Sequence, residues 1–198
     1  MAMEAVLAAY RARGREGQTN YAFALNQYAV PILTSAGRLS DAEAAERAGI
    51  AVFHAVQGKD PPTLLVGLGK VLIDRGDLRA AEQALAQALA LQAAAGDAIS
   101  SFHAAALYEQ GRLAVARGDL ATGRARFDED LALQRQQGAG STREAARALA
   151  GIASTLASAE RPARCRALLG EASAIDARIL APTHPERQAI ERDLATCP

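Results

Sequence analysis

Apolar residues in the middle of the chain recur at the spacing of an α-helix. Three leucines stand four residues apart, at Leu64, Leu68 and Leu72, and this spacing forms one apolar stripe on a helix. Gly76-Asp77 interrupts the pattern, because glycine tolerates a left-handed turn and aspartate caps a following helix. A second stripe follows at Leu78, Ala81, Leu85 and Leu89. The segment therefore predicts two helices joined by a tight turn.

The same pattern returns later in the chain at a fixed offset. The tetrapeptide Arg-Gly-Asp-Leu at 75–78 reappears at 117–120, and Leu-Ala-Leu-Gln at 89–92 reappears at 131–134. Two identical tetrapeptides at one offset of 42 residues indicate an internal repeat. Because one helix pair cannot bury its apolar stripe alone, repeated pairs are expected to stack and share a continuous core.

Weaker copies of the unit flank these two. Gly37-Arg38-Leu39 resembles an inter-helix turn, and Ser40 with Glu43 predicts a capping box for the helix that follows. A second capping box is predicted at 141–144, and another inter-helix turn near 158–162. The repeat therefore extends beyond its two clearest copies.

We expect an all-α fold, a solenoid of antiparallel helix pairs that forms a single domain over residues 1–198. The expected helix pairs lie at about 17–58, 60–96, 97–138 and 140–180. A short helix at about 2–13 precedes them, and a C-terminal capping helix at about 185–196 follows. Pro31 falls inside the first expected helix, where a proline kinks or breaks a helix.

Residues 68–88 resemble the tetratricopeptide signature in order and spacing. The matching residues are Leu68, Gly69, Leu72, Gly76, Asp77, Ala81, Leu85 and Ala88. The period is longer than the usual one of about 34 residues, and is similar to the long-period variant of kinesin light chains and many bacterial regulatory proteins. Residues 24–29 resemble the asparagine-bearing first helix of that variant, and 183–186 the start of a new repeat. The second copy departs from the signature, since Gly123 replaces the expected alanine and Asp130 a small residue.

The resemblance implies a right-handed superhelical solenoid whose concave groove binds a protein or peptide partner. In the family, set places of the first helix of each pair face that groove. With Gly69 and Gly111 matched, these places fall on Thr63, Val66, Lys70, Ile73 and Asp74, and then on Ala105, Tyr108, Arg112, Val115 and Ala116. Asn26 takes one such place in the first pair. The candidate partner-binding residues are therefore Asn26, Thr63, Val66, Lys70, Asp74, Tyr108 and Arg112.

Two of these candidates carry a positive charge at equivalent places. Because Lys70 and Arg112 match each other in the repeat, the resemblance implies that they stand side by side on one surface. With an asparagine and a tyrosine nearby, they would hold a peptide backbone or an acidic side chain. The alternative interpretation is an ordinary solvated helix face.

Charge and composition narrow the class of partner. Lys plus Arg and Asp plus Glu each number 22, so the formal net charge is zero. Nucleic-acid binding rests on an excess of Lys and Arg, so no nucleic-acid partner is expected. No apolar run approaches the roughly 20 residues of a membrane span, and the run at 5–10 is too short for a signal peptide. We expect a cytoplasmic protein with no membrane partner.

Residues that could support catalysis are sparse. Cys165 and Cys197 lack the spacing of metal ligands, and we expect two free thiols, with a disulfide as the alternative. The three histidines are scattered and form no catalytic or metal-binding pattern. Residues 66–70 superficially resemble a phosphate loop, but Val71 stands where serine or threonine is needed. The sequence therefore predicts no enzyme, no cofactor and no metal site.

Together these observations favour a protein–protein or protein–peptide interaction module or scaffold. The resemblance implies that it is part of a bacterial signalling or regulatory protein. The alternative is a peptide-responsive regulator, such as the sensor domain of a transcriptional regulator or Ser/Thr kinase. The sequence leaves self-association as a homo-oligomer open.

Overall fold

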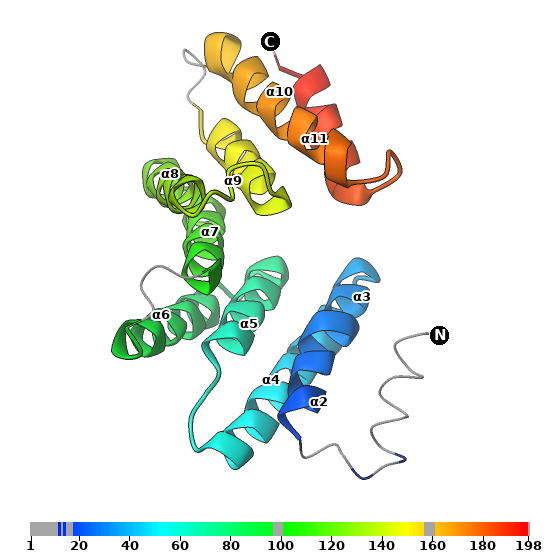
Figure 1. Cartoon of the computed structure of the whole chain (residues 1–198), viewed down its shortest axis with the longest axis vertical. Coiled ribbons are helices and arrows are strands. Elements are labelled where there is room, and N and C mark those ends of the chain that lie inside the picture. The colour runs from blue at the N-terminus through cyan, green and yellow to red at the C-terminus, as the bar shows by residue number, and fades with distance from the viewer. Residues whose placement is uncertain (1–11, 13, 15–17, 97–100, 157–160, 198) are drawn as a thin grey trace. The chain divides into compact units, whose positions relative to one another are not determined.

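The computed structural model of the chain describes residues 12, 14, 18–96, 101–156 and 161–197. Helices make up most of this part of the chain, and it contains no strand (Figure 1). The predicted all-α fold is therefore confirmed. Almost all of the helix expected at about 2–13 and most of the turn expected near 158–162 lie outside the described residues.

Consecutive helices form antiparallel pairs joined by short connections, as the sequence predicts (Figure 1). The first unit contains α2 (Thr19–Ala24), η1 (Leu25–Ala29), α3 (Val30–Ser35), α4 (Leu39–Gln57), α5 (Pro62–Arg75) and α6 (Leu78–Ala94). The second unit contains α7 (Ser101–Ala116), α8 (Leu120–Gln136), α9 (Arg143–Ser154), α10 (Arg161–Ile179) and α11 (Pro185–Ala195).

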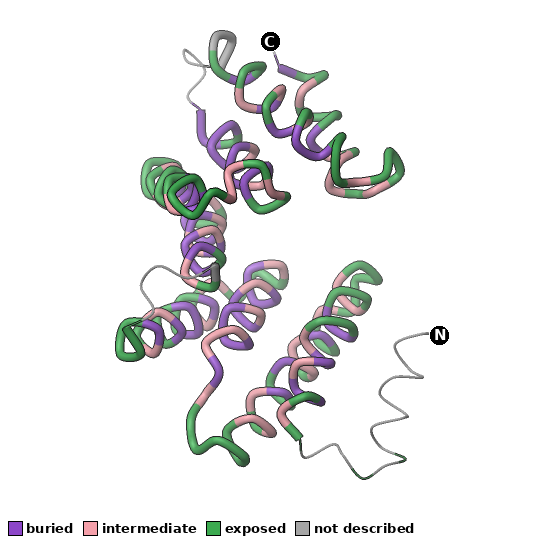
Figure 2. Tube along the Cα trace, viewed as in Figure 1, coloured by how far each residue is buried: buried purple, intermediate pink, exposed green. Residues whose placement is uncertain are grey.

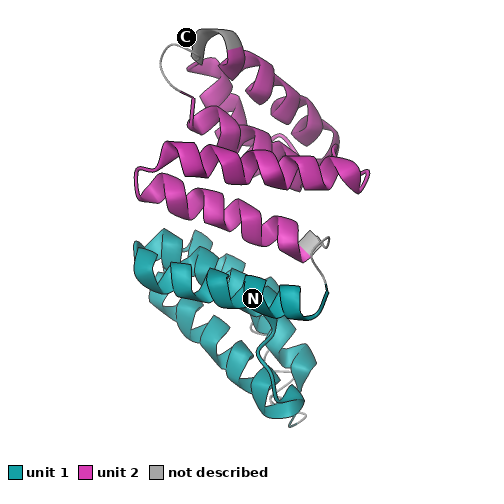
Figure 3. Cartoon of the chain, turned by 90° about the vertical axis from the view of Figure 1, so that its left-hand side faces the viewer, with its two compact units in different colours: residues 1–98 teal, residues 99–198 magenta. Residues whose placement is uncertain are grey.

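These two compact units comprise residues 1–98 and 99–198 (Figure 3). In the first unit α4 packs against α2 and α5, and α5 packs against α6. In the second, α7 packs against α8, α9 against both α8 and α10, and α10 against α11. Within each unit a first helix thus contacts the second helix of its own pair and of the preceding pair, as in stacked repeats. A single domain over 1–198 stays a prediction.

The repeated glycine–aspartate turns have the same geometry in both units. Gly76 and Gly118 each have a φ of 83°, in the left-handed region that glycine adopts without steric cost. Asp77 and Asp119 each accept a hydrogen bond from the amide three residues on, at 3.2 and 3.0 Å. Their own amides bond back to the preceding helix, which satisfies carbonyls at its end. The predicted turns are confirmed.

Glycines at matching places let the helices of a pair approach closely. A Cβ on Gly69 would lie 2.7 Å from the Leu85 side chain, and one on Gly111 would lie 2.5 Å from the Phe127 ring. Gly151 of α9 faces the same ring, because its Cβ would come within 2.9 Å. Buried positions run along α9, which packs between its neighbours (Figure 2). Phe127 therefore fills the core of the second unit between α7 and α9.

Pro31 disturbs the first helix, as the sequence predicts. The five residues of η1 form a wider π-helical turn directly before it, and α-helical geometry resumes at Val30. Proline lacks an amide hydrogen, and its ring crowds the carbonyl four residues earlier. We attribute the widened turn to this crowding. The turn contains Asn26, one of the candidate binding residues.

The capping box predicted at Ser40 and Glu43 is wrong. The helix α4 begins at Leu39, so its N-cap is Arg38, two residues before Ser40, and no side chain caps it. Glu43 pairs instead with Arg47 on its own helix and with Arg75 at the end of α5. The two arginines draw the carboxylate away from the helix terminus, so it ties α4 to the next pair.

The cap predicted at the start of α9 is displaced by one residue. Thr142, not Ser141, is the N-cap, and its hydroxyl oxygen accepts a hydrogen bond from the Ala145 amide at 3.3 Å. The same hydroxyl donates to Gln134 of α8 at 3.0 Å. This contact with the neighbouring helix explains why threonine takes the capping position.

The two cysteines form a disulfide, so the prediction of two free thiols is wrong. A sequence separation of 32 conceals that α10 and α11 lie side by side and antiparallel (Figure 1). This packing brings the Cα atoms of Cys165 and Cys197 to 5.9 Å, within the range that a disulfide spans. Both residues are buried. The bond ties the C-terminal helix to α10.

Candidate functional site

A cavity of about 200 Å³ lies in the second unit, between α7, α8 and the start of α9. Its lining residues are Ala104, Ala105, Tyr108, Glu109, Asp130, Gln134, Gln137, Ala139, Thr142, Glu144 and Arg147. Apolar walls with a few convergent polar groups are typical of binding sites. Tyr108 is the sequence-predicted site residue that lines this cavity.

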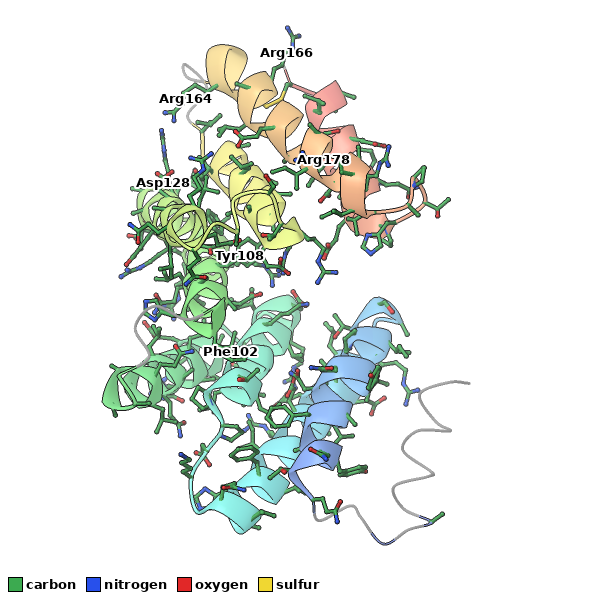
Figure 4. All side chains as sticks on the ribbon, viewed as in Figure 1. Phe102, Tyr108, Asp128, Arg164, Arg166 and Arg178 are labelled. Carbon is green, nitrogen blue, oxygen red and sulfur yellow. A yellow bond between two sulfur atoms is a disulfide. The ribbon has the colours of Figure 1, made fainter. Side chains whose placement is uncertain are left out.

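Tyr108 forms one wall of the cavity, on the side of α7 that faces α9 (Figure 4). Its ring packs against Phe127 with 5.4 Å between the ring centroids. The Arg147 guanidinium lies over the ring, 4.2 Å from its centroid, which is a favourable cation–π geometry. Burial raises the pKa of Tyr108 above its ordinary value. The wall is thus a fixed aromatic face with a protonated hydroxyl.

Glu109 is buried beside this wall and is neutralised by two arginines. Its Oε2 accepts a hydrogen bond from Arg112 Nη1 at 2.7 Å, and its Oε1 lies 3.6 Å from Arg147 Nη2. The residue is 4% exposed, and a buried carboxylate without a partner is strongly destabilising. Arg112, predicted to meet an acidic partner, is therefore engaged by an acid of its own helix.

Asp130 contributes a second buried carboxyl, 1% exposed. Its Oδ1 accepts a hydrogen bond from Gln134 Nε2 at 2.7 Å, and the amide oxygen of Gln134 accepts the Thr142 hydroxyl. Burial raises the pKa of Asp130 to about 6, against the opposing effects of Gln134 and Arg147. The hydrogen bonds from Thr142 to Gln134 and from Gln134 to Asp130 join the cap of α9 to the interior of α8. They hold an ionisable group in the cavity lining.

Equivalent positions of the first unit carry smaller or apolar residues. Val66, Gly67 and Ala88 stand 42 residues before Tyr108, Glu109 and Asp130. Ala88 is fully buried, so the repeat packs at this place without an acid. Burying a carboxyl in place of an alanine costs stability, and ionisable groups kept at such a cost often mark functional sites. The second unit therefore differs from the first in the chemistry of this region.

A smaller polar cluster occurs in the first unit. Asn26 Nδ2 donates to Glu46 Oε1 at 2.6 Å. Glu46 is fully buried, and its Oε2 has no hydrogen-bond partner among the described residues. Gly67 leaves room for the pair, because a Cβ there would overlap both side chains. Burial raises the pKa of Glu46 to about 7, while the Asn26 bond and the charge of Lys70 lower it.

The structure does not bring all the predicted residues together. Val66 is buried, whereas Thr63 and Asp74 are half-buried on α5. Lys70 belongs to the first unit and Arg112 to the second. A joint surface formed by these two cations stays a prediction.

Sequence reasoning missed most of the cavity lining. Gln134, Thr142 and Arg147 belong to no motif, and they meet only because α8 and α9 pack together. Asp130 did leave a signal, since it stands where the signature expects a small residue. This departure from the repeat pattern is the signal that could have marked Asp130 as a candidate.

Two histidines, His184 and His54, make contacts that serve the fold. His184 caps α11 by accepting the Glu186 amide at 3.3 Å, and His54 Nδ1 lies 2.7 Å from Asp60 Oδ1. Within the described ranges, no group of three or more His, Cys, Asp or Glu side chains is arranged to hold a metal ion. No helix in those ranges combines the length and apolarity needed to cross a membrane.

Solved structures with the same arrangement of helices are found by structural comparison. A putative kinesin light chain of Podosopora anserina with nearly identical TPR-like repeats gives a TM-score of 0.64 at 18% identity, over 90% of this chain and 85% of that one. A single-substitution form of the same protein gives a TM-score of 0.62 at 19% identity, over 86% of this chain and 82% of that one. BtubC (BKLC) from P. vanneervenii gives 0.66 at 15% identity, over 98% and 82%. No protein-family model matches the sequence, and a search of curated proteins finds no match. Likeness at these identities establishes the fold alone.

Proposed function

We propose that this TPR-like repeat protein is an interaction module that binds an extended segment of a partner protein along the first helices of its repeats. In the second unit the segment contacts α7 and α9, and one of its side chains enters the cavity beside Tyr108. The fold supports this proposal, because stacked helix pairs create extended surfaces that bind proteins.

The cavity is the observation that carries the proposal. Its volume of about 200 Å³ is below the roughly 300–1,000 Å³ of small-molecule and cofactor sites, and suits a single side chain. Its polar groups are held by packing and hydrogen bonds: Tyr108 by Phe127 and Arg147, and Asp130 by Gln134. Such preorganised groups lower the entropic cost of binding.

The wider setting of the module is proposed on the family resemblance. We place the chain in a bacterial signalling or regulatory protein, with a binding rather than a catalytic role. The partner surface would include Asn26, Thr63, Lys70 and Asp74 in the first unit, with Tyr108 and Arg112 in the second. Val66 contributes packing instead, because it is buried.

Selection of binders from a random peptide library against the wild-type chain tests the proposal. Selected peptides should lose at least tenfold in affinity for Ala105→Phe, because Ala105 is exposed and its enlarged side chain would block the cavity. The matched control is Ala125→Phe, an exposed residue of α8 outside the cavity lining. Affinities would be measured by calorimetry after circular dichroism confirms helical folding of both variants.

Peptides that bind Ala105→Phe as tightly as the wild type would contradict a role of the cavity. A library that yields no binder would contradict peptide recognition itself. Equal losses in both phenylalanine variants would show that the effect is not specific to the cavity, and the assignment of the cavity would then fail.

A further inference from the structure

The cavity of the second unit contains a carboxyl group that forms no ion pair with a described residue. Of the three carboxyl groups in its lining, Glu109 is bonded to Arg112 and Arg147. Glu144 is exposed and lies 3.7 Å from Arg143. Among the described residues, the hydrogen-bond partner of Asp130 is the neutral amide of Gln134, and it forms no ion pair. The lining also contains Arg147, which lies 3.6 Å from Glu109 and whose charge lowers the pKa of Asp130. Asp130 is therefore the carboxyl group of the cavity interior that is left without an ion pair of its own to a described residue.

The accessible surface of the cavity is mainly apolar. Three alanines line it with the Tyr108 ring, at Ala104, Ala105 and Ala139. Such walls suit an aliphatic stem, and long basic side chains bury their methylene groups along apolar surface while the charged end finds a polar partner. Shape and charge together favour an aliphatic chain that ends in a positive charge.

We infer that the cavity accepts a lysine side chain of the partner segment, with its ammonium group against Asp130 and its stem along Tyr108. This inference rests on the proposed function, since the lysine belongs to the bound segment. An acidic side chain would meet Asp130 as a like charge.

The affinity should depend on pH through Asp130. The polar groups around it are Gln134 of its own helix, Glu109 of α7, and Glu144 and Arg147 of α9. Burial raises its pKa to about 6, and an ammonium ion binds the ionised form. Lysine binding should therefore weaken as the pH falls through about 6.

Titration of the full chain with N-acetyl-lysine N-methylamide, followed by amide NMR at pH 7.5, tests the inference. The matched probe is the norleucine analogue, which has an aliphatic stem but no ammonium group. The lysine probe should shift amides of residues 104–109, 130–137 and 142–147 in a saturable way. Its affinity should fall at least tenfold in Asp130→Asn and at pH 5, but should not change in Asp128→Asn. Asp128 is an exposed aspartate of the same helix (Figure 4).

Equal binding of the norleucine probe, or full affinity of Asp130→Asn, would overturn the lysine assignment. The peptide selection separates this failure from failure of the proposed function. Cavity-dependent peptides that contain no lysine would support the function and reject the lysine. Binding of the lysine probe that depends on Asp130, in the absence of any selected peptide, would support the ammonium site and reject the peptide function.

Discussion

Glu46 and Asp130 are acids in surroundings that oppose their ionisation. Both are buried, and each keeps a side-chain amide as its hydrogen-bond donor, Asn26 for Glu46 and Gln134 for Asp130. Burial raises the pKa of Glu46 to about 7 and that of Asp130 to about 6. In both cases the folded chain holds a proton more tightly than the unfolded chain, which links protonation to stability.

The first prediction is that stability decreases as the pH rises from 4 to 8. A raised pKa contributes stability that is fully present below the unfolded pKa and is lost as the pH rises through the folded value. Each acid should account for roughly 3 kcal/mol of this change in the free energy of unfolding. Glu46→Gln and Asp130→Asn should each flatten the dependence, as measured by urea unfolding at several pH values. Asp128→Asn is the exposed control, and an unchanged slope in both buried variants would contradict the prediction.

The second prediction concerns the turn glycines. Gly76→Ala and Gly118→Ala should each destabilise the chain by about 1–2 kcal/mol, because an alanine at φ of 83° is strained although there is space for its Cβ. Gly170→Ala is the opposite control, since this glycine lies within α10 with open space around it. The substitution should raise the free energy of unfolding by about 0.5–1 kcal/mol. Thermal unfolding of the three variants separates backbone strain from contact effects. Equal melting temperatures would show that the turns tolerate a side chain.

At the scale of helices, features that depend on one or two neighbouring residues could be predicted from the sequence. The two glycine–aspartate turns and the disturbance at Pro31 were predictable, because each depends on the conformational preferences of one or two residues. The capping residues were less predictable. Glu43 is drawn to Arg75 of another helix, and Thr142 to Gln134, so tertiary contacts decide between candidates that local rules leave equal.

The candidate site was predicted only in part for the same reason. Tyr108 was identified because its place in the repeat is fixed by the matched glycines, Gly69 and Gly111. Arg147 stacks on Tyr108 and pairs with Glu109. These contacts form because α9 packs on the preceding helix pair. Periodicity identifies which side chains share a helix face, but it does not give the contacts between helices.

The third prediction concerns the disulfide between α10 and α11. It closes a loop with a sequence separation of 32, and loop-closure entropy predicts that reduction costs about 3–4 kcal/mol. The melting temperature should therefore fall when a reductant is added, as measured by circular dichroism. The Cys165→Ser, Cys197→Ser double variant should melt near the reduced wild type and not respond to the reductant. A wild type that melts alike with and without reductant would contradict a stabilising role of the bond.

At the scale of the whole molecule, Leu85 and Phe127 allow equivalent perturbations of the two units. They stand 42 residues apart, at matching places of the repeat, and are 1% and 2% exposed. Leu85 fills the space beside Gly69, and Phe127 the space beside Gly111 and Gly151. Truncation of either side chain should open a cavity that costs about 2–5 kcal/mol.

The fourth prediction is that each truncation loosens its own unit. In repeat proteins stability is approximately a sum of terms within and between neighbouring repeats, and local opening follows the units of contact. Hydrogen exchange measured by mass spectrometry should therefore speed up in α5 and α6 for Leu85→Ala, and in α7, α8 and α9 for Phe127→Ala. Each variant serves as the control for the other. Equal acceleration throughout α4–α10 in both variants would instead favour one cooperative domain, because a single folding unit distributes the loss of any core contact over all its helices.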